Sequence, residues 1–282
     1  MKLKSTIKNA ARLPALFLIL FFVSSPSFAQ YGEQFNLWGS KTVFALDPLM
    51  DGLLLGGGAL LSGGDLLLDN VLEVNRREYK GRTYYKSDVN RFDRKFMHQY
   101  SKKRDKAADI LLAATMATPA VLAATQKEEW LTCGIMYAET LLIANGIKEL
   151  TKLAVTRARP YMYYSPDTYP KKDIDDGDWA NSFPSGHSTM AFASATFTSY
   201  TFCKYFKDSA WRFPVVAGSY AMAFGVATLR NRSGNHFMSD IVSGAAIGTA
   251  VGFLVPWLHT FNANNDLNIG LLSNGVSVAI KL

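Results

Sequence analysis

The chain has few cysteines, a low mean hydropathy and no repeats. Two of its 282 residues are cysteine, Cys133 and Cys203, and both lie within apolar stretches. This number and placement indicate no disulfide framework and no cysteine metal site, so we expect two small buried side chains. The mean hydropathy of +0.03 is low for a chain made entirely of membrane spans. There is no internal repeat and no low-complexity tract.

Residues 1–29 have the pattern of an export signal. A basic start is followed by an apolar run over 13–23 and by small side chains at Ser27 and Ala29, as at a cleavage site. The apolar run is shorter than the roughly 20 residues that a membrane span needs. Four of the 30 Lys and Arg residues lie in this segment, which leaves 26 against 23 Asp and Glu. We therefore do not interpret the basic charge as nucleic-acid binding.

Six apolar stretches follow the signal, and their length and their Leu, Ala and Met content favour helices over strands. They cover about 49–72, 107–125, 130–150, 188–203, 213–229 and 241–258. The predicted fold is all-α, a membrane-embedded helical bundle. We divide the mature chain into an apolar and basic region at 30–106, a helical core at 107–260 and a tail at 261–282.

Two regions have a different character. The tail contains two short strand-like segments joined by Asn274-Gly275, which predicts a C-terminal β-hairpin. The stretch 73–106 is strongly basic. Either it is a solvated surface or it is attracted to anionic lipid headgroups, and the sequence favours neither.

The first motif is Lys152-Leu-Ala-Val-Thr-Arg-Ala-Arg159-Pro160. Lys152 and Arg159 are seven residues apart, so on one helix they project from nearly the same face. Pro160 is expected to end that helix and to leave both cations at its C-terminal end. Two cations there can bind a phosphate group, which arginine holds with two hydrogen bonds. The alternative is a pair of basic side chains reaching toward a membrane interface.

The second motif is Pro184-Ser185-Gly186-His187, directly before an apolar stretch. Ser185 is a favourable N-cap, and Gly186 allows a ligand to approach the backbone closely. Free N–H groups at a helix start bind anions. His187 is positioned to act as a general acid. A plain helix start with a capping histidine is the alternative.

The third motif joins Arg230, His236 and Asp240. His236 and Asp240 are four residues apart, which places them on one helix face within hydrogen-bonding reach. A carboxylate that fixes one imidazole nitrogen leaves the other as an oriented nucleophile. Arg230 would add a third phosphate-binding cation. A structural His–Asp contact is the alternative for the pair alone.

The order Lys-x6-Arg-Pro, Pro-Ser-Gly-His, Arg-x5-His-x3-Asp resembles the type 2 phosphatidic acid phosphatase superfamily over roughly residues 130–258. This superfamily includes membrane lipid phosphatases, soluble class A acid phosphatases and vanadium haloperoxidases. Leu229 departs from the family pattern, which usually has serine before the arginine. The long loop 161–183 is this chain's own. Its aromatic residues suggest an interfacial lid, and its glycine is out of register for a calcium loop.

The resemblance implies a role for each matched residue. Lys152, Arg159 and Arg230 bind phosphate with the backbone near Ser185 and Gly186. His236 attacks phosphorus to form a phosphohistidine, Asp240 orients His236, and His187 protonates the leaving group. No metal and no cofactor is expected, because the cations stabilise the developing charge. His98 and His259 match no family position and are expected to be bystanders.

The resulting expectation is a phosphatase that acts on a lipid phosphate at the outer face of a bacterial inner membrane, with a periplasmic active site. A soluble periplasmic acid phosphatase and a phosphotransferase with an alcohol or lipid acceptor are the alternatives within this chemistry. A lipid-binding protein without turnover is the non-enzymatic alternative. The partners expected are the membrane and a phosphorylated lipid, without nucleic acid. The sequence does not indicate an oligomeric state.

Overall fold

The computed structural model describes residues 43–70, 78–263, 267–272 and 275–280. The predicted export signal at 1–29 lies outside the described residues, as does Asn274 of the predicted turn. Within the described ranges, each of the six apolar stretches forms a helix. These are α2 (Pro48–Asn70), α4 (Lys102–Met116), α5 (Glu129–Ala154), α7 (Gly186–Tyr205), α8 (Arg212–Arg232) and α9 (Met238–Ala263).

Short elements connect these helices. They are η2 (Lys86–Asp88), α3 (Arg91–Lys95), η3 (Thr118–Ala124), η4 (Pro160–Tyr163), η5 (Pro166–Thr168), α6 (Lys171–Asp175) and η6 (Asp178–Ala180). The second half of the basic stretch thus contains α3 and the first turn of α4. The loop predicted at 161–183 is a chain of single turns.

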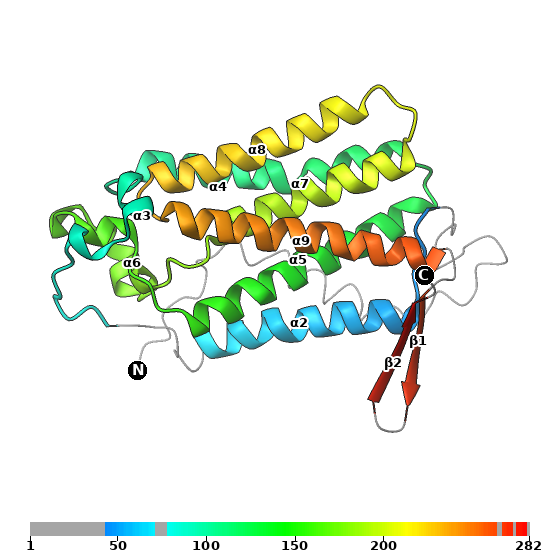
Figure 1. Ribbon diagram of the computed structural model, residues 1–282, viewed down its shortest axis with the longest axis horizontal. Coiled ribbons are helices and arrows are strands. Elements are labelled where there is room, and N and C mark those ends of the chain that lie inside the picture. The colour runs from blue at the N-terminus through cyan, green and yellow to red at the C-terminus, as the bar shows by residue number, and fades with distance from the viewer. Residues whose placement is uncertain (1–42, 71–77, 264–266, 273–274, 281–282) are drawn as a thin grey trace, which may run out of the picture. The chain divides into compact units, whose positions relative to one another are not determined.

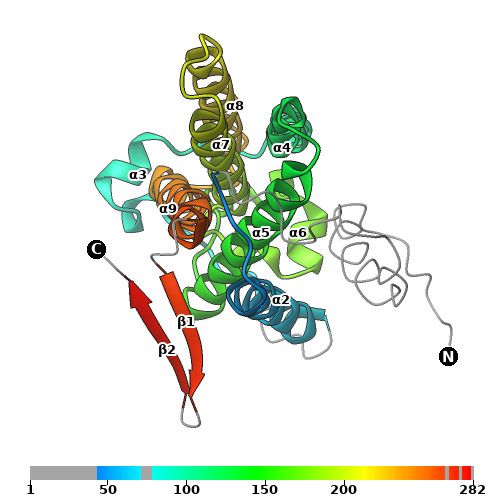
Figure 2. The same cartoon turned by 90° about the vertical axis from the view of Figure 1, so that its right-hand side faces the viewer.

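Helix α7 is central to the arrangement. It packs against α4, α5, α8 and α9, and α2 packs along the outer side of α5, as Figures 1 and 2 show. A buried cluster between α5, α7 and α9 includes Met136, Phe197 and Val251. The residues expected to carry chemistry lie where α5 and α8 end and where α7 and α9 begin, so one end of this packed group gathers all three motifs.

Helices α7 and α9 approach each other closely because α9 presents glycine at every fourth position of the contact. A Cβ on Gly244 would lie 2.5 Å from the carbonyl oxygen of Ser185, and one on Gly248 would lie 2.1 Å from that of Thr189. Neither position has room for a larger side chain. Small residues spaced four apart are typical of close helix contacts in membranes. This contact fixes the start of α7 against the start of α9.

The tail forms two strands, β1 (Leu267–Leu272) and β2 (Gly275–Ile280), where the sequence predicts a hairpin. They pair antiparallel, with Leu267 opposite Ile280 and Leu272 opposite Gly275.

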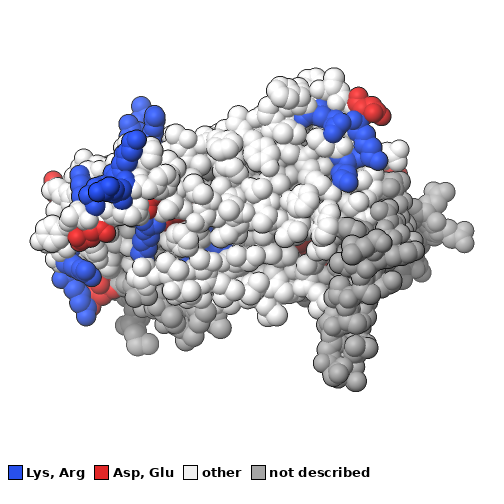
Figure 3. All heavy atoms as spheres, in the orientation of Figure 1, with Lys and Arg blue, Asp and Glu red and all other residues white. Residues whose placement is uncertain are grey.

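Charged side chains are unevenly distributed on the face shown in Figure 3. Lys, Arg, Asp and Glu gather near the two ends of the helices, and the surface between them carries few charges. Two segments of the described chain are long and apolar enough to cross a membrane, Lys102–Ala124 and Met238–Thr260. Large apolar side chains point outward on the helices, among them Ile110, 73% exposed, and Phe213, 80% exposed.

The loop after Pro160 differs from the predicted interfacial lid. Tyr161 is fully buried and Trp179 is 8% exposed, and both belong to an aromatic cluster inside the protein. The Tyr161 hydroxyl donates to Asp173 at 3.0 Å. The loop is therefore held against the helices through its aromatic side chains, and its acidic residues face inward as well as outward.

Candidate active site

The first motif does not lie on one helix, which corrects the expectation for Lys152 and Arg159. Helix α5 ends at Ala154, and the chain then extends beside residues 179–182. The amide of Arg157 donates to the Ala180 carbonyl at 2.8 Å, and the amide of Arg159 donates to the Trp179 carbonyl at 2.9 Å. These backbone hydrogen bonds form in place of a further turn of α5. The residue before proline is already biased toward extended conformations, which favours this outcome.

The extended segment brings Arg159 into the protein interior. Its side chain is buried and donates from Nε to the Asp178 carbonyl at 2.9 Å, from Nη2 to the Asp178 carboxylate at 2.5 Å and from Nη1 to Asn235 at 3.2 Å. Partial burial opposes ionisation of Asp178, but Arg159 and then Lys152 hold its pKa below the ordinary value. Arg159 is therefore a fixed cation with a charged partner.

Arg230 lies beside it at the end of α8. Its Nη1 donates to Asp105 of α4, and Asn235 donates to the same Asp105 oxygen at 2.9 Å. Asn235 thus links Arg159 to the Asp105 carboxylate that binds Arg230. Within the described structure, Nε of Arg230 is buried and has no hydrogen-bond partner. An unpaired donor in a buried cation is costly unless a ligand meets it.

The second motif forms the start of α7 as the sequence predicts. Ser185 is the N-cap, and its hydroxyl accepts from the Ser188 amide at 3.4 Å. Gly186 lies against Lys148 of α5, whose Nζ would be 3.6 Å from a Cβ at that position. His187 in the first turn has its Nε2 2.8 Å from Asp109 of α4. The helix start thus combines backbone donors, an ammonium group and an imidazole.

The third motif places His236 in the turn before α9. Its ring is buried, and Nδ1 lies 2.7 Å from the carbonyl oxygen of Ser182. A carbonyl only accepts, so Nδ1 carries the proton and Nε2 has the free lone pair. Burial and then the cations Arg159 and Arg230 hold the pKa of His236 well below its usual 6.5. The imidazole is therefore neutral near pH 7.

Asp240 does not hydrogen-bond His236 directly, contrary to the prediction from their spacing. The shortest approach of the carboxylate to Nδ1 is 3.9 Å. Asp240 instead accepts from the Ser182 hydroxyl at 2.6 Å and from the Phe237 amide at 2.8 Å. Because Ser182 also supplies the carbonyl that binds His236, the carboxylate positions the histidine through this one residue.

Arg157, to which the sequence assigned no role, completes the support. Its guanidinium donates to Asp240 and, at 2.7 Å, to Asp93 of α3, and it stacks 4.2 Å from the centre of the Phe237 ring. Asp93 in turn accepts from the amide and hydroxyl of Ser239 in the first turn of α9. A fixed arginine therefore holds the start of α9 and the carboxylate of Asp240 together.

Lys152 stands further out than the two arginines. It lies in the last turn of α5, where its Nζ is 3.7 Å from Glu149. Lys148, one turn earlier, forms an ion pair with the same glutamate. Two lysines on this face therefore share one carboxylate and add net positive charge beside Gly186.

The structure thus brings His187, His236 and Asp240 to one end of the helices, together with Arg159, Arg230, Ser185 and Gly186. Sequence reasoning did not identify the acidic partners, which are Asp105 and Asp109 of α4 and Asp178 of the loop. Asp105 and Asp109 lie beside Lys102, Lys103, Arg104 and Lys106 in the charged first half of α4, so the local sequence does not distinguish them from solvated surface charges. Nothing in the local sequence marks Asp178.

Comparison with known proteins gives three matches. The sequence model of the PAP2 superfamily matches residues 134–264. A lipid A 1-phosphatase of Porphyromonas gingivalis is 39% identical over 83 residues, which are 29% of this chain and 17% of that protein. The chain thus aligns with about a sixth of this curated relative.

Among solved structures, the crystal structure of the first transmembrane PAP2 type phosphatidylglycerolphosphate phosphatase from Bacillus subtilis is similar. The match has a TM-score of 0.42 and 17% sequence identity, and it covers 74% of this chain and 94% of that chain. The matched family residues 134–264 include all three motifs at the site. The similarity to the PAP2 superfamily thus extends over this segment, somewhat less than half of the chain.

Proposed function

We propose that the protein is a phosphatase that removes a phosphate group from a lipid phosphate through a phosphohistidine intermediate. The observation that carries this proposal is the placement of His236. Its protonated Nδ1 is fixed by the Ser182 carbonyl at 2.7 Å, it is kept neutral by burial and by Arg159 and Arg230, and its Nε2 is free to attack. A nucleophile needs such a fixed, unprotonated nitrogen.

In the first step, Nε2 of His236 attacks phosphorus and the bond from phosphorus to the lipid oxygen breaks. Burial and Arg230 lower the pKa of His187 to about 4 without substrate, and the negative charge of the bound phosphate raises it, so that His187 takes up a proton. His187 then gives this proton to the lipid oxygen, and the alcohol leaves. In the second step, water attacks the phosphohistidine, His187 takes up its proton, and inorganic phosphate is released with His236 restored. Arg159, Arg230 and the amides at the start of α7 stabilise the negative charge that develops on the phosphoryl oxygens.

The same arginines are paired with carboxylates in this structure, Arg230 with Asp105 and Arg159 with Asp178. A phosphate group that binds here must share both guanidinium groups with these acids or displace them. The unpaired Nε of Arg230 is available to a phosphoryl oxygen without any displacement. The side chains supply the cationic charge for this chemistry, so we expect turnover without an added divalent metal.

A lipid is the proposed substrate class because the site adjoins an apolar outer surface. Asp109, which contacts His187, neighbours Ile110, whose side chain is 73% exposed. Helix α4 is also part of the candidate span Lys102–Ala124, and only 17% of the apolar 18-residue window of this span is buried within the protein. An apolar outer surface of this kind indicates contact with lipid. In a soluble acid phosphatase, something other than lipid would have to cover this apolar surface.

The proposed location is the inner membrane, with the active site on the periplasmic side. This location rests on the export-signal pattern at 1–29 and on the two candidate spans. Impermeant thiol labelling of a single-cysteine variant at Tyr164 in intact cells tests it, with Cys133 and Cys203 replaced by serine. Labelling supports the periplasmic side, and protection until the membrane is opened contradicts it.

The test of activity is phosphate release by the full-length protein in detergent, with EDTA present. The panel contains phosphatidic acid, phosphatidylglycerol phosphate, a polyprenyl diphosphate, lipid A and a soluble ester. Lipid A comes first because of the 39% identical segment in the P. gingivalis relative. The His236→Ala variant should lose turnover and the matched His98→Ala variant should keep it. Equal release by both variants would contradict the proposal.

Trapping the intermediate separates hydrolysis from transfer. Acid-labile radioactive label on the protein after brief incubation with labelled substrate supports phosphohistidine, and it should be absent in His236→Ala. Label that moves to an added lipid alcohol would assign a phosphotransferase with the same nucleophile.

A further inference from the structure

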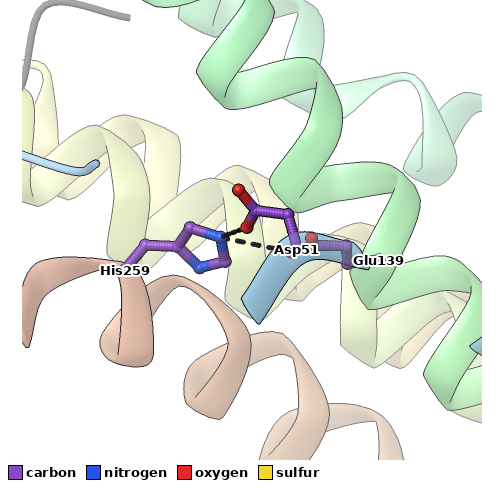
Figure 4. A group of neighbouring side chains, drawn as sticks. All are labelled: Asp51, Glu139 and His259. Carbon is purple, nitrogen blue, oxygen red and sulfur yellow. Dashed lines mark hydrogen bonds and ion pairs between the residues drawn. The ribbon is translucent and has the colours of Figure 1, made fainter. Parts of the chain in front are cut away.

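A second group of ionisable side chains lies far from the phosphate site. Asp51 in the first turn of α2, Glu139 in the middle of α5 and His259 near the end of α9 point toward one another, as Figure 4 shows. All three are buried, with 4%, 0% and 0% of their surface exposed. Nε2 of His259 is 2.8 Å from Asp51 Oδ1 and 3.3 Å from Glu139 Oε2.

These residues stand apart from the proposed catalytic machinery. His259 and Asp240 lie nineteen residues apart on α9, and at 1.5 Å per residue this separates them by about 28 Å. His259 matches no motif, and the sequence predicts a bystander at this position. Its carboxylate partners come from helices that are distant in sequence.

The hydrogen bonding of His259 indicates that the cluster needs a cation. Its Nδ1 lies 2.8 Å from the Val255 carbonyl, which only accepts, so Nδ1 carries a proton. In the neutral imidazole, Nε2 is then a lone pair that faces two carboxylate oxygens. Three acceptors in contact repel one another unless a proton or a metal ion lies between them.

Glu139 strengthens this requirement. Both of its carboxylate oxygens are buried, and apart from the 3.3 Å contact of Oε2 with His259 neither has a hydrogen-bond partner within the described ranges of the chain. A buried carboxylate without a donor is one of the most costly groups in a protein interior. It points into the cluster with Asp51 and His259, so whatever neutralises it binds there.

We propose that Asp51, Glu139 and His259 bind one divalent transition-metal ion, of which Zn²⁺ and Mn²⁺ are the first candidates. Two carboxylates and one imidazole are suitable ligands for either ion. The candidate ligand atoms all lie within 4.8 Å of one another. With metal–ligand bonds of about 2.1 Å, tetrahedral neighbours are about 3.4 Å apart, so the 2.8 and 3.3 Å distances need only small adjustments.

The surroundings hold each ligand in place. The Val255 carbonyl fixes the imidazole so that Nε2 faces the cluster, which is the usual support for a metal-bound histidine. Asp51 uses its second oxygen to accept from the Asp47 amide at 2.7 Å, which leaves Oδ1 for the metal. Water or the second oxygen of Glu139 would complete four ligands.

The role that follows is structural. Helix α2 lies outside the matched family segment 134–264, and the metal would join it to α5 and α9 of that segment. Metal binding to the native state alone adds its binding free energy to stability. The ion would therefore stabilise the docking of α2, and the phosphate chemistry would proceed without contact to it.

The test is the metal content of full-length protein purified in detergent through a tag without histidine or cysteine. We expect about one Zn or Mn per chain by elemental analysis in the wild type. The His259→Leu and Glu139→Gln variants should each contain less than a tenth of that amount. The matched variants His98→Leu and Glu128→Gln should retain the metal, since Glu128 lies exposed at the start of the same helix.

Thermal unfolding provides a second measurement that does not depend on the variants folding. Wild type grown in metal-depleted medium should unfold at a lower temperature and should recover when ZnCl₂ or MnCl₂ is added during refolding or expression. Metal-free wild type that unfolds at the same temperature with and without these ions overturns the proposal. That outcome would mean that a proton shared by the three side chains, and not a metal ion, neutralises the cluster.

Discussion

His236 directs its protonated Nδ1 to the carbonyl oxygen of Ser182 at 2.7 Å. The Asp240 carboxylate, which sequence spacing suggests as its partner, lies 3.9 Å away and binds the Ser182 hydroxyl. Ser182 therefore contacts both residues, with its carbonyl on the imidazole and its hydroxyl on the carboxylate. The orientation of the proposed nucleophile depends on a residue outside all three motif cores.

The first prediction concerns Ser182→Ala. This variant keeps the carbonyl but removes the hydroxyl that binds Asp240, so the carboxylate loses one of its donors. A hydrogen bond to a charged group contributes about 1.5–3 kcal/mol, so we expect kcat to fall roughly 10- to 100-fold with little change in KM. Steady-state kinetics on the best lipid substrate measures this.

The control for that variant is Ser209→Ala, in the exposed connection between α7 and α8, which should behave as wild type. A rise in KM at constant kcat would show that Ser182 serves substrate binding and not the nucleophile.

The second prediction concerns pH. His236 attacks only when Nε2 is unprotonated, and burial with Arg159 and Arg230 holds its pKa well below 6.5. As the pH falls, activity is therefore kept through 6.5 and is lost only when the depressed pKa is reached. The pH profile of kcat/KM, which reports groups of the free enzyme, should show no acidic limb centred near 6.5. A limb centred there would mean that His236 has an ordinary pKa.

The six long helices were predictable because each corresponds to an apolar stretch of suitable length, and the start of α7 was predictable because Ser185 is a favourable N-cap. The end of α5 was not. Val155 to Arg159 leave the helix to pair with residues 179–182, and this contact forms only after the intervening loop has folded. The structure brings most of the motif residues to one end of the helices, but the geometry between them depends on this loop.

The partners of the motif residues were also hidden from the sequence. Asp105 and Asp109 come from α4, and Asp93 comes from α3, far from the motifs along the chain. Electrostatic pairs between separate helices leave no periodic pattern in one sequence. The same reason applies to Asp51, Glu139 and His259, which converge only through the packing of α2, α5 and α9.

The third prediction concerns Asp178→Asn. Asp178 binds Arg159 at 2.5 Å and so competes with a phosphate group for that guanidinium. Removing the carboxylate charge while keeping the backbone carbonyl on Nε should make Arg159 more available to anions. We expect vanadate, which mimics the pentacoordinate phosphorus, to inhibit the variant at a concentration several-fold lower than for wild type.

Asp176→Asn is the matched control for this change, since Asp176 is exposed in the same loop. Its inhibition constant should stay at the wild-type value. Weaker vanadate inhibition of Asp178→Asn would mean that the carboxylate is needed to hold Arg159 in its binding position, and that it does not compete with the anion.

The fourth prediction concerns the contact of α7 with α9. A Cβ on Gly248 would lie 2.1 Å from the Thr189 carbonyl oxygen and 2.8 Å from the Ala193 amide nitrogen, so Gly248→Ala must push the helices apart. Overpacking of this kind costs about 1–3 kcal/mol.

Gly218→Ala on α8 is the control, because a Cβ there meets nothing within 4 Å. The control should raise stability by about 0.5–1 kcal/mol, since alanine is the better helix former. Thermal unfolding should therefore shift down for Gly248→Ala and up for Gly218→Ala. Because Asp240 and Ser185 sit at the site end of this contact, the Gly248 variant should also lose phosphatase activity below its unfolding temperature. Full activity of Gly248→Ala below its unfolding temperature would mean that the hydrogen bonds of Arg157 alone hold the starts of α7 and α9 in place.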